Sequence, residues 1–91
     1  MARLITTDGI TKEVKPISGT KFSLKELQNY VGGFIQMLPL PDKSMAFCNE
    51  EGLLHNLPQN VEATSVISGI FKRPTQVFVG DVVICTPNEV E

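Results

Sequence analysis

The sequence has 91 residues, of which 42% are hydrophobic and 20% charged, with a formal net charge of −2. This length suits one small domain, and the composition is typical of an ordinary globular protein. The slight acidic excess disfavours both a nucleic-acid-binding surface, which needs clustered Lys and Arg, and a nucleic-acid mimic, which needs a dense acidic face. We therefore expect a single domain over residues 1–91.

The N-terminal residues predict a short β-hairpin. Residues 3–7 are rich in β-branched side chains and end at Asp8-Gly9, a dipeptide that favours a tight turn. An alternating pattern then resumes over residues 10–15 and stops at Pro16, which has no backbone N–H to donate.

A helix is predicted to begin after Ser23. Ser23 and Glu26 have the S-x-x-E spacing of a capping box, and Phe22 and Leu27 have the spacing of a hydrophobic staple. Gly32-Gly33 gives the permissive backbone on which helices commonly end, so the main helix should span residues 24–31. Its apolar face should be formed by residues three or four apart, namely Leu24, Leu27 and Val31.

The remaining segments predict further strands and a second helix. Residues 34–38 and 45–49 should pair as a hairpin, followed by a turn in which Gly52 takes a positive φ. Asn60 should cap a short helix over residues 61–68. Residues 76–85 should form one apolar strand hinged at Gly80, before a polar tail over residues 87–91. We expect an α+β domain with a small mixed sheet of four to five strands.

Five short motifs occur in an order that resembles a family of small domains of unknown function encoded mostly by bacteriophages and plasmids. They are L-K-E-L-Q-x-x-V-G-G from residue 24, P-L-P from 39, N-E-E-G from 49, L-P-x-N from 57 and G-D-V-V-I from 80. The resemblance covers residues 24–84 and implies an origin rather than a reaction. Residues 66–75 depart from the pattern, and residues 70–74 are interpreted as an individual insertion.

The titratable residues do not form a recognisable catalytic or metal-binding motif. Cys48 and Cys85 lie in apolar segments, which favours buried reduced thiols, although the sequence leaves a disulfide open. His55 is the only histidine and is placed in a loop, which disfavours both a Cys–His dyad and a zinc site. Glu50-Glu51 is more typical of a solvated turn than of a magnesium site. We expect no enzymatic activity, no metal and no cofactor.

Two groups of residues are candidates for partner binding. The first comprises Asn49, Glu50, Glu51, Gln59 and Asn60. The favoured interpretation is structural, with the asparagines capping turns and Leu57 filling a core gap, and the alternative is a polar rim of amides and carboxylates that binds a partner. The second could be an apolar anchor with a basic rim or a buried corner, and it comprises Ile70, Phe71, Lys72 and Arg73.

The leading functional hypothesis is a non-enzymatic protein of phage or mobile-element origin that binds and inhibits a bacterial host protein. A host defence system such as a CRISPR effector is its most natural target. The alternative is an oligomeric sponge for a nucleotide-like signal, with Asn49, Gln59, Asn60, Lys72 and Arg73 as donors. We expect a cytoplasmic location because the N-terminus lacks a signal-peptide pattern and no apolar run is long enough to span a membrane. A homodimer is compatible with the small core.

Overall fold

The computed structural model describes residues 2–17 and 19–91. Met1, predicted to precede the first strand, and Ser18, predicted to lie in a connection, are outside the described residues. The helical elements are α1, α2 and a short 3₁₀ helix η1, with the bounds Leu24–Val31, Val61–Phe71 and Pro87–Glu89. The strands β1 to β5 have the bounds Ala2–Ile5, Thr11–Val14, Ile35–Pro39, Met45–Asn49 and Val82–Cys85.

The strands form one five-stranded sheet in the order β2-β1-β5-β4-β3. The predicted hairpins are confirmed as β1–β2 and β3–β4, and β5 is inserted between them, antiparallel to both β1 and β4. The α+β class is confirmed, but every pair of neighbouring strands is antiparallel, so the expected mixed pairing is wrong. The reason is that α1 connects β2 to β3, which lie at opposite edges of the sheet instead of side by side.

Strand β5 is shorter than the apolar segment that contains it. Only Val82–Cys85 joins the sheet, and all four residues are buried because β5 is central and covered on both faces. Gly80, with φ +75°, separates this strand from residues 76–79, which make only an isolated bridge between Gln59 and Val79. The expected hinge at Gly80 is therefore a change of chain direction just before β5 begins.

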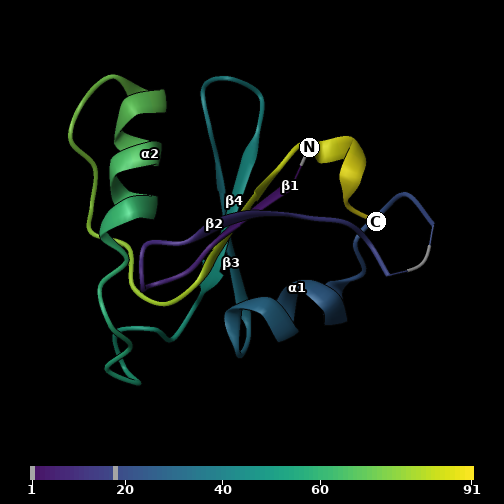
Figure 1. Cartoon of the computed structure of the whole chain (residues 1–91), viewed down its shortest axis with the longest axis horizontal. Coiled ribbons are helices and arrows are strands. Elements are labelled where there is room, and N and C mark those ends of the chain that lie inside the picture. The colour runs from purple at the N-terminus through teal and green to yellow at the C-terminus, as the bar shows by residue number, and fades with distance from the viewer. Residues whose placement is uncertain (1, 18) are drawn as a thin grey trace.

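The sheet separates two apolar cores, and adjacent β5 residues Val82 and Val83 belong to different cores because side chains alternate along a strand. The α2-side core contains Ala63 and Ile67 from α2 together with Val82. The α1-side core contains Phe22 and Leu27 together with Val83. Figure 1 shows α1 and α2 well apart, at different sides of the strands.

Helix α1 confirms its predicted start and end. The Ser23 hydroxyl accepts the Glu26 N–H at 3.1 Å, and the Glu26 carboxylate accepts the Ser23 N–H at 3.2 Å, which completes the capping box. Gly32 ends the helix at φ +80°. Leu24, however, is 58% exposed and leaves the expected apolar face, because the first turn extends beyond the edge of the core.

Helix α2 begins after Asn60 as predicted but continues three residues beyond the predicted end, to Phe71. Its last turn closes at Lys72, which has φ +59°. Ile70 and Phe71 are half-buried and pack against the α2-side core, so the burial of both lies between a buried corner and an exposed anchor.

The C-terminal residues are docked against the domain and do not form a free tail. Phe22 donates its N–H to the Glu89 carbonyl at 2.6 Å, and the Glu91 N–H donates to the Phe22 carbonyl at 3.0 Å. Val90 packs against the α1-side core. No helix in the described ranges has the length and apolar character required to cross a bilayer.

Candidate functional site: a hollow beside strand β3

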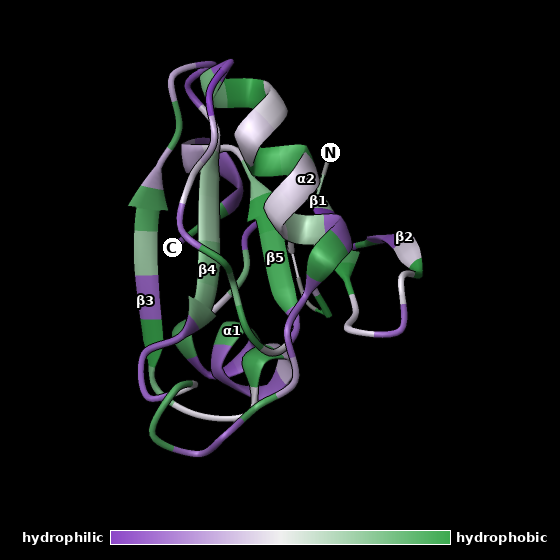
Figure 2. Ribbon diagram, turned by 90° about the vertical axis from the view of Figure 1, so that its left-hand side faces the viewer, coloured by the Kyte–Doolittle hydropathy of each residue, from purple (hydrophilic) through white to green (hydrophobic). Residues whose placement is uncertain are grey.

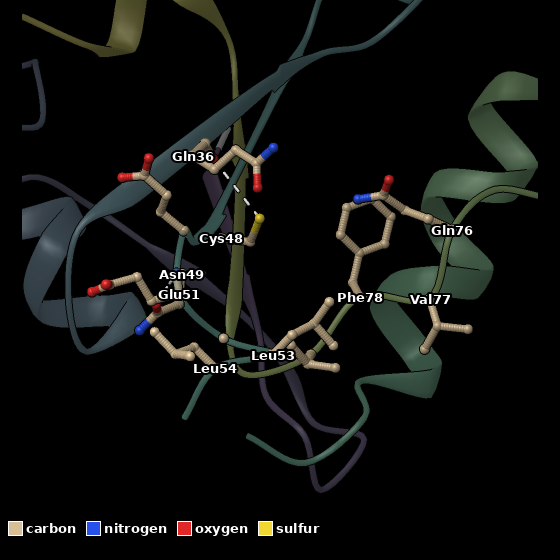
Figure 3. Close-up of a pocket in the computed structure, with 12 residues that line it drawn as sticks. Gln36, Cys48, Asn49, Glu51, Leu53, Leu54, Gln76, Val77 and Phe78 are labelled. Carbon is tan, nitrogen blue, oxygen red and sulfur yellow. Dashed lines mark hydrogen bonds between the residues drawn. The ribbon is translucent and has the colours of Figure 1, made fainter. Parts of the chain in front are cut away.

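A hollow of about 310 Å³ opens on the α2 side of the sheet, between strands β3–β4, the turn after β4 and the segment before β5. Figure 3 shows Gln36 and Cys48 on one side of it, Phe78 on the other, and Leu53 and Leu54 along its lower border. The residues that line it include Gln36, Cys48, Leu53, Leu54, Gln76, Val77 and Phe78. We call it the β3 hollow.

The turn that presents the two leucines is held by Asn49 at the end of β4. The Asn49 amide donates to the Val31 carbonyl at 3.1 Å, and its side-chain oxygen accepts the Glu51 N–H at 2.8 Å. The turn therefore rests on the C-terminus of α1. Because its backbone is fixed at this base, Leu53 and Leu54 remain outside the core, with 80% and 75% exposure.

Gly52 is required in this turn for space and not for a positive φ. It is absent from the residues with positive φ, which corrects the expectation from the sequence; Asn56, at φ +54°, takes that conformation in the same turn. A Cβ atom at Gly52 would lie 2.7 Å from Cγ2 of Val79. The turn thus packs closely against the segment that forms the opposite wall of the β3 hollow.

That opposite wall, residues 76–79, is anchored through the start of α2. The Phe78 N–H donates to the Thr64 hydroxyl at 2.9 Å, and the Phe78 carbonyl accepts the Asn60 N–H at 2.7 Å. Phe78 itself is buried, whereas Val77 beside it is 54% exposed. The wall therefore has a fixed position and offers one apolar side chain to solvent.

Asn60 is the most heavily bonded polar side chain in this region. It is fully buried, its amide donates to the carbonyls of Ile5 and Gly80 at 2.9 Å each, and its oxygen caps α2 by accepting the Ala63 N–H at 2.9 Å. All of its hydrogen-bonding capacity serves the fold. Asn60 cannot contact a partner, and the capping interpretation of this residue is correct.

The polar chemistry of the hollow is modest. Burial raises the pKa of the Cys48 thiol, which disfavours the nucleophilic thiolate, and the thiol lies 3.9 Å from the Gln36 carbonyl. His55 lies on the neighbouring surface, 57% exposed, with its Nε2 3.7 Å from a Glu51 carboxylate oxygen. No cluster of three or more His, Cys, Asp or Glu with the geometry of a metal site occurs among residues 2–17 and 19–91.

The structure brings together only part of the predicted partner-binding set. Glu50 and Glu51 line the β3 hollow, and Asn49 lines it while 93% of its surface is covered. Phe71 and Arg73 line an adjoining hollow that shares Gln76 and Phe78 with the first. The Arg73 guanidinium lies over the Phe71 ring, 5.6 Å from its centroid. Residues that line neither of these two hollows are Gln59, Asn60, Ile70 and Lys72.

Residues of both predicted groups therefore line two adjoining hollows. The sequence did not predict the exposed apolar residues of the β3 hollow. Leu53, Leu54 and Val77 are exposed and border the same hollow, although Leu53 and Val77 are 24 positions apart in the sequence. The adjacent leucines between Gly52 and His55 were a usable signal, since paired leucines in an otherwise polar turn are unusual. Gln36 and Val77 gave no such signal.

The donor set proposed for a nucleotide does not converge. Asn60 caps the first turn of α2, whereas Lys72 and Arg73 follow its last turn. The amides of Asn49 and Asn60 are also engaged with backbone carbonyls. The five proposed donors therefore do not gather at one site.

A model of the domain of unknown function DUF3846 matches residues 1–91. The chain belongs to this family. No curated protein and no solved structure matches the chain.

Proposed function

We propose that this DUF3846 domain is a non-enzymatic protein-binding module and that the β3 hollow is its contact surface. The observation that carries the proposal is the gathering of Leu53, Leu54 and Val77, three exposed apolar side chains, around one hollow. Exposed apolar groups that form a contiguous, rimmed patch are typical of interaction sites.

The surroundings of these side chains support this proposal. Glu50 and Glu51 are exposed at the border, and Gln36 and Gln76 add amide groups on opposite walls. An apolar centre with a polar rim is the usual anatomy of a protein–protein interface. The walls are held by hydrogen bonds that are buried or partly buried, so little ordering would be required on binding.

For the partner, we propose a bacterial host protein, with the domain encoded by a phage or plasmid and acting as an inhibitor. The support is the motif order described for residues 24–84, and an anti-defence role is the specific case that this origin favours. A domain that contributes recognition but no catalytic group would inhibit by occluding a surface or by holding one conformation of its target.

The proposal is tested with the double variant Leu53→Ser/Leu54→Ser. Both side chains are largely exposed, so the free energy of unfolding should change by less than about 1 kcal/mol, while affinity for a captured host protein should fall at least about tenfold. The matched control is Ile17→Ser/Leu24→Ser, which removes two exposed apolar side chains, 85% and 58% exposed, outside the β3 hollow.

Tagged wild-type protein and both variants would be used to capture proteins from bacterial lysate, and affinities would be measured on the purified target. A target retained by wild type and control but lost with the Leu53/Leu54 variant supports the proposal. Equal retention by all three proteins would reject the β3 hollow as the contact surface.

A further inference from the structure

Strand β3 is an edge of the sheet, and its outer backbone groups face solvent. The Glu50 N–H donates to the Phe34 carbonyl at 2.8 Å and the Leu40 N–H to the Ser44 carbonyl at 2.9 Å, so the even-numbered residues bond toward β4. Because the direction alternates along an antiparallel strand, Ile35 and Met37 direct their N–H and C=O groups outward. Figure 2 shows β3 at the outer margin of the sheet, with no strand beyond it.

The two edges of the sheet differ sharply in charge. The other edge, β2, contains Lys12 and Glu13 and is followed by Lys15, which is how natural proteins commonly protect an edge from pairing. In contrast, the sequence is uncharged from Val31 to Pro41. Met37 is 52% exposed on this unprotected edge.

We propose that β3 pairs with β3 of a second copy of this chain, antiparallel and centred on Gln36, to form a continuous sheet across a twofold axis. An uncharged strand can pair with its own copy without repulsion between like charges. Strand β2 contains Lys12 and Glu13, so centring a β2–β2 pair on either residue would place two like charges opposite each other. The occupant of this edge is therefore a second copy, and the inference does not depend on the proposed function.

Pro39 excludes one alternative register of this pairing. With Gln36 at the centre, Ile35 of each copy lies opposite Met37 of the other, and every outward N–H and C=O of these residues is paired. A register centred on Met37 would place Ile35 opposite Pro39, which has no N–H, and would leave the Ile35 carbonyl without a donor. Gln36 is thus the residue that meets its own counterpart.

This register also matches side chains by polarity. Ile35 and Met37 form apolar cross-strand pairs on the α1 side of the sheet, and the two Gln36 amides lie opposite each other on the α2 side. Gln36 also lines the β3 hollow, so the twofold axis would place two such hollows side by side on one surface. The two Gln36 side chains would then lie between these two hollows.

The register predicts charge pairing that can be tested by mixing variants. Gln36→Lys and Gln36→Glu each place two like charges directly opposite one another in the dimer, so each variant alone should associate less than wild type. Mixing them should restore association as a heterodimer about fivefold tighter than either homodimer. Sedimentation equilibrium over a concentration series measures each constant without any partner protein.

Two controls separate this mechanism from loss of folding or from other modes of association. Circular dichroism should show the wild-type fold in both variants, since Gln36 is exposed. The variants Thr11→Lys and Thr11→Glu on β2 should each associate with the same dissociation constant as wild type, because β2 lies at the other edge of the sheet. A wild-type chain that stays monomeric up to about 1 mM, or variants that associate as wild type does, would overturn the proposal.

Discussion

Two buried asparagines show how single polar residues hold this domain together. Asn49 ties the turn after β4 to the end of α1, and Asn60 ties the start of α2 to β1 and to the segment before β5. A buried amide is stable only when its donors and acceptor are all satisfied. Asn49 lines the β3 hollow, and Asn60 anchors one of its walls by donating its backbone N–H to the Phe78 carbonyl.

Asn60→Ala should lower the free energy of unfolding by about 3 kcal/mol, because it removes a helix cap and two buried hydrogen bonds, those to the Ile5 and Gly80 carbonyls. Urea denaturation measures the change. Asn29→Ala, at an exposed position of α1, is the control and should cost less than about 1 kcal/mol. A similar effect of the two substitutions would contradict the role assigned to Asn60.

At the scale of elements, the N-terminus of α1 depends on a charged cap. The Ile17 N–H donates to the Glu26 carboxylate at 2.9 Å, and this bond, followed by those from Ser23, holds the pKa of Glu26 below its usual value despite partial desolvation. The carboxylate therefore joins the helix start to the loop before it. A lowered pKa means that ionised Glu26 stabilises the fold above the pKa of the unfolded chain, near 4.3, and that this stabilisation is lost as pH falls through the folded-state value.

Glu26→Gln should therefore destabilise the domain at pH 7, and the difference from wild type should shrink below about pH 4 as the wild-type carboxyl becomes protonated. Thermal denaturation between pH 3 and pH 7 follows this difference. Glu13→Gln on β2 is the matched control, because its exposed carboxylate makes no side-chain hydrogen bond within the described ranges. A difference that stays constant with pH would show that the charge of Glu26 has no part in the cap.

At the scale of the whole molecule, the central strands belong to both cores at once. Cys48 faces the α2-side core and Cys85 the α1-side core, so the two thiols lie on opposite faces of the sheet and cannot form a disulfide with each other. Burial raises the pKa of both thiols, and that of Cys85 reaches about 11, with a further contribution from the charge of Glu89. The reactivity of each thiol can therefore report on the opening of one core, the α2-side core for Cys48 and the α1-side core for Cys85.

Both thiols should react with a disulfide reagent at pH 8 at the same slow rate, because their shared central strands make the two layers open together. Mass spectrometry of partly labelled protein distinguishes the sites. The variants Cys48→Ala and Cys85→Ala, each with one thiol left, check the assignment. Much faster labelling of Cys48 would contradict joint opening, and would show either that the α2 side opens by itself or that the reagent reaches Cys48 through the β3 hollow.

Local patterns were sufficient to determine much of this protein from its sequence. The Ser23–Glu26 box, the Asp8-Gly9 turn and the Asn60 cap each depend on residues close in the chain, so the two helix starts and both hairpins could be predicted. Only the tertiary structure showed that β5 lies between the hairpins and that the Asn60 amide donates to the Ile5 and Gly80 carbonyls. It also showed that Leu53, Leu54 and Val77 meet at one hollow. Those facts depend on contacts between distant segments, and side-chain exposure is set by what the rest of the fold leaves uncovered.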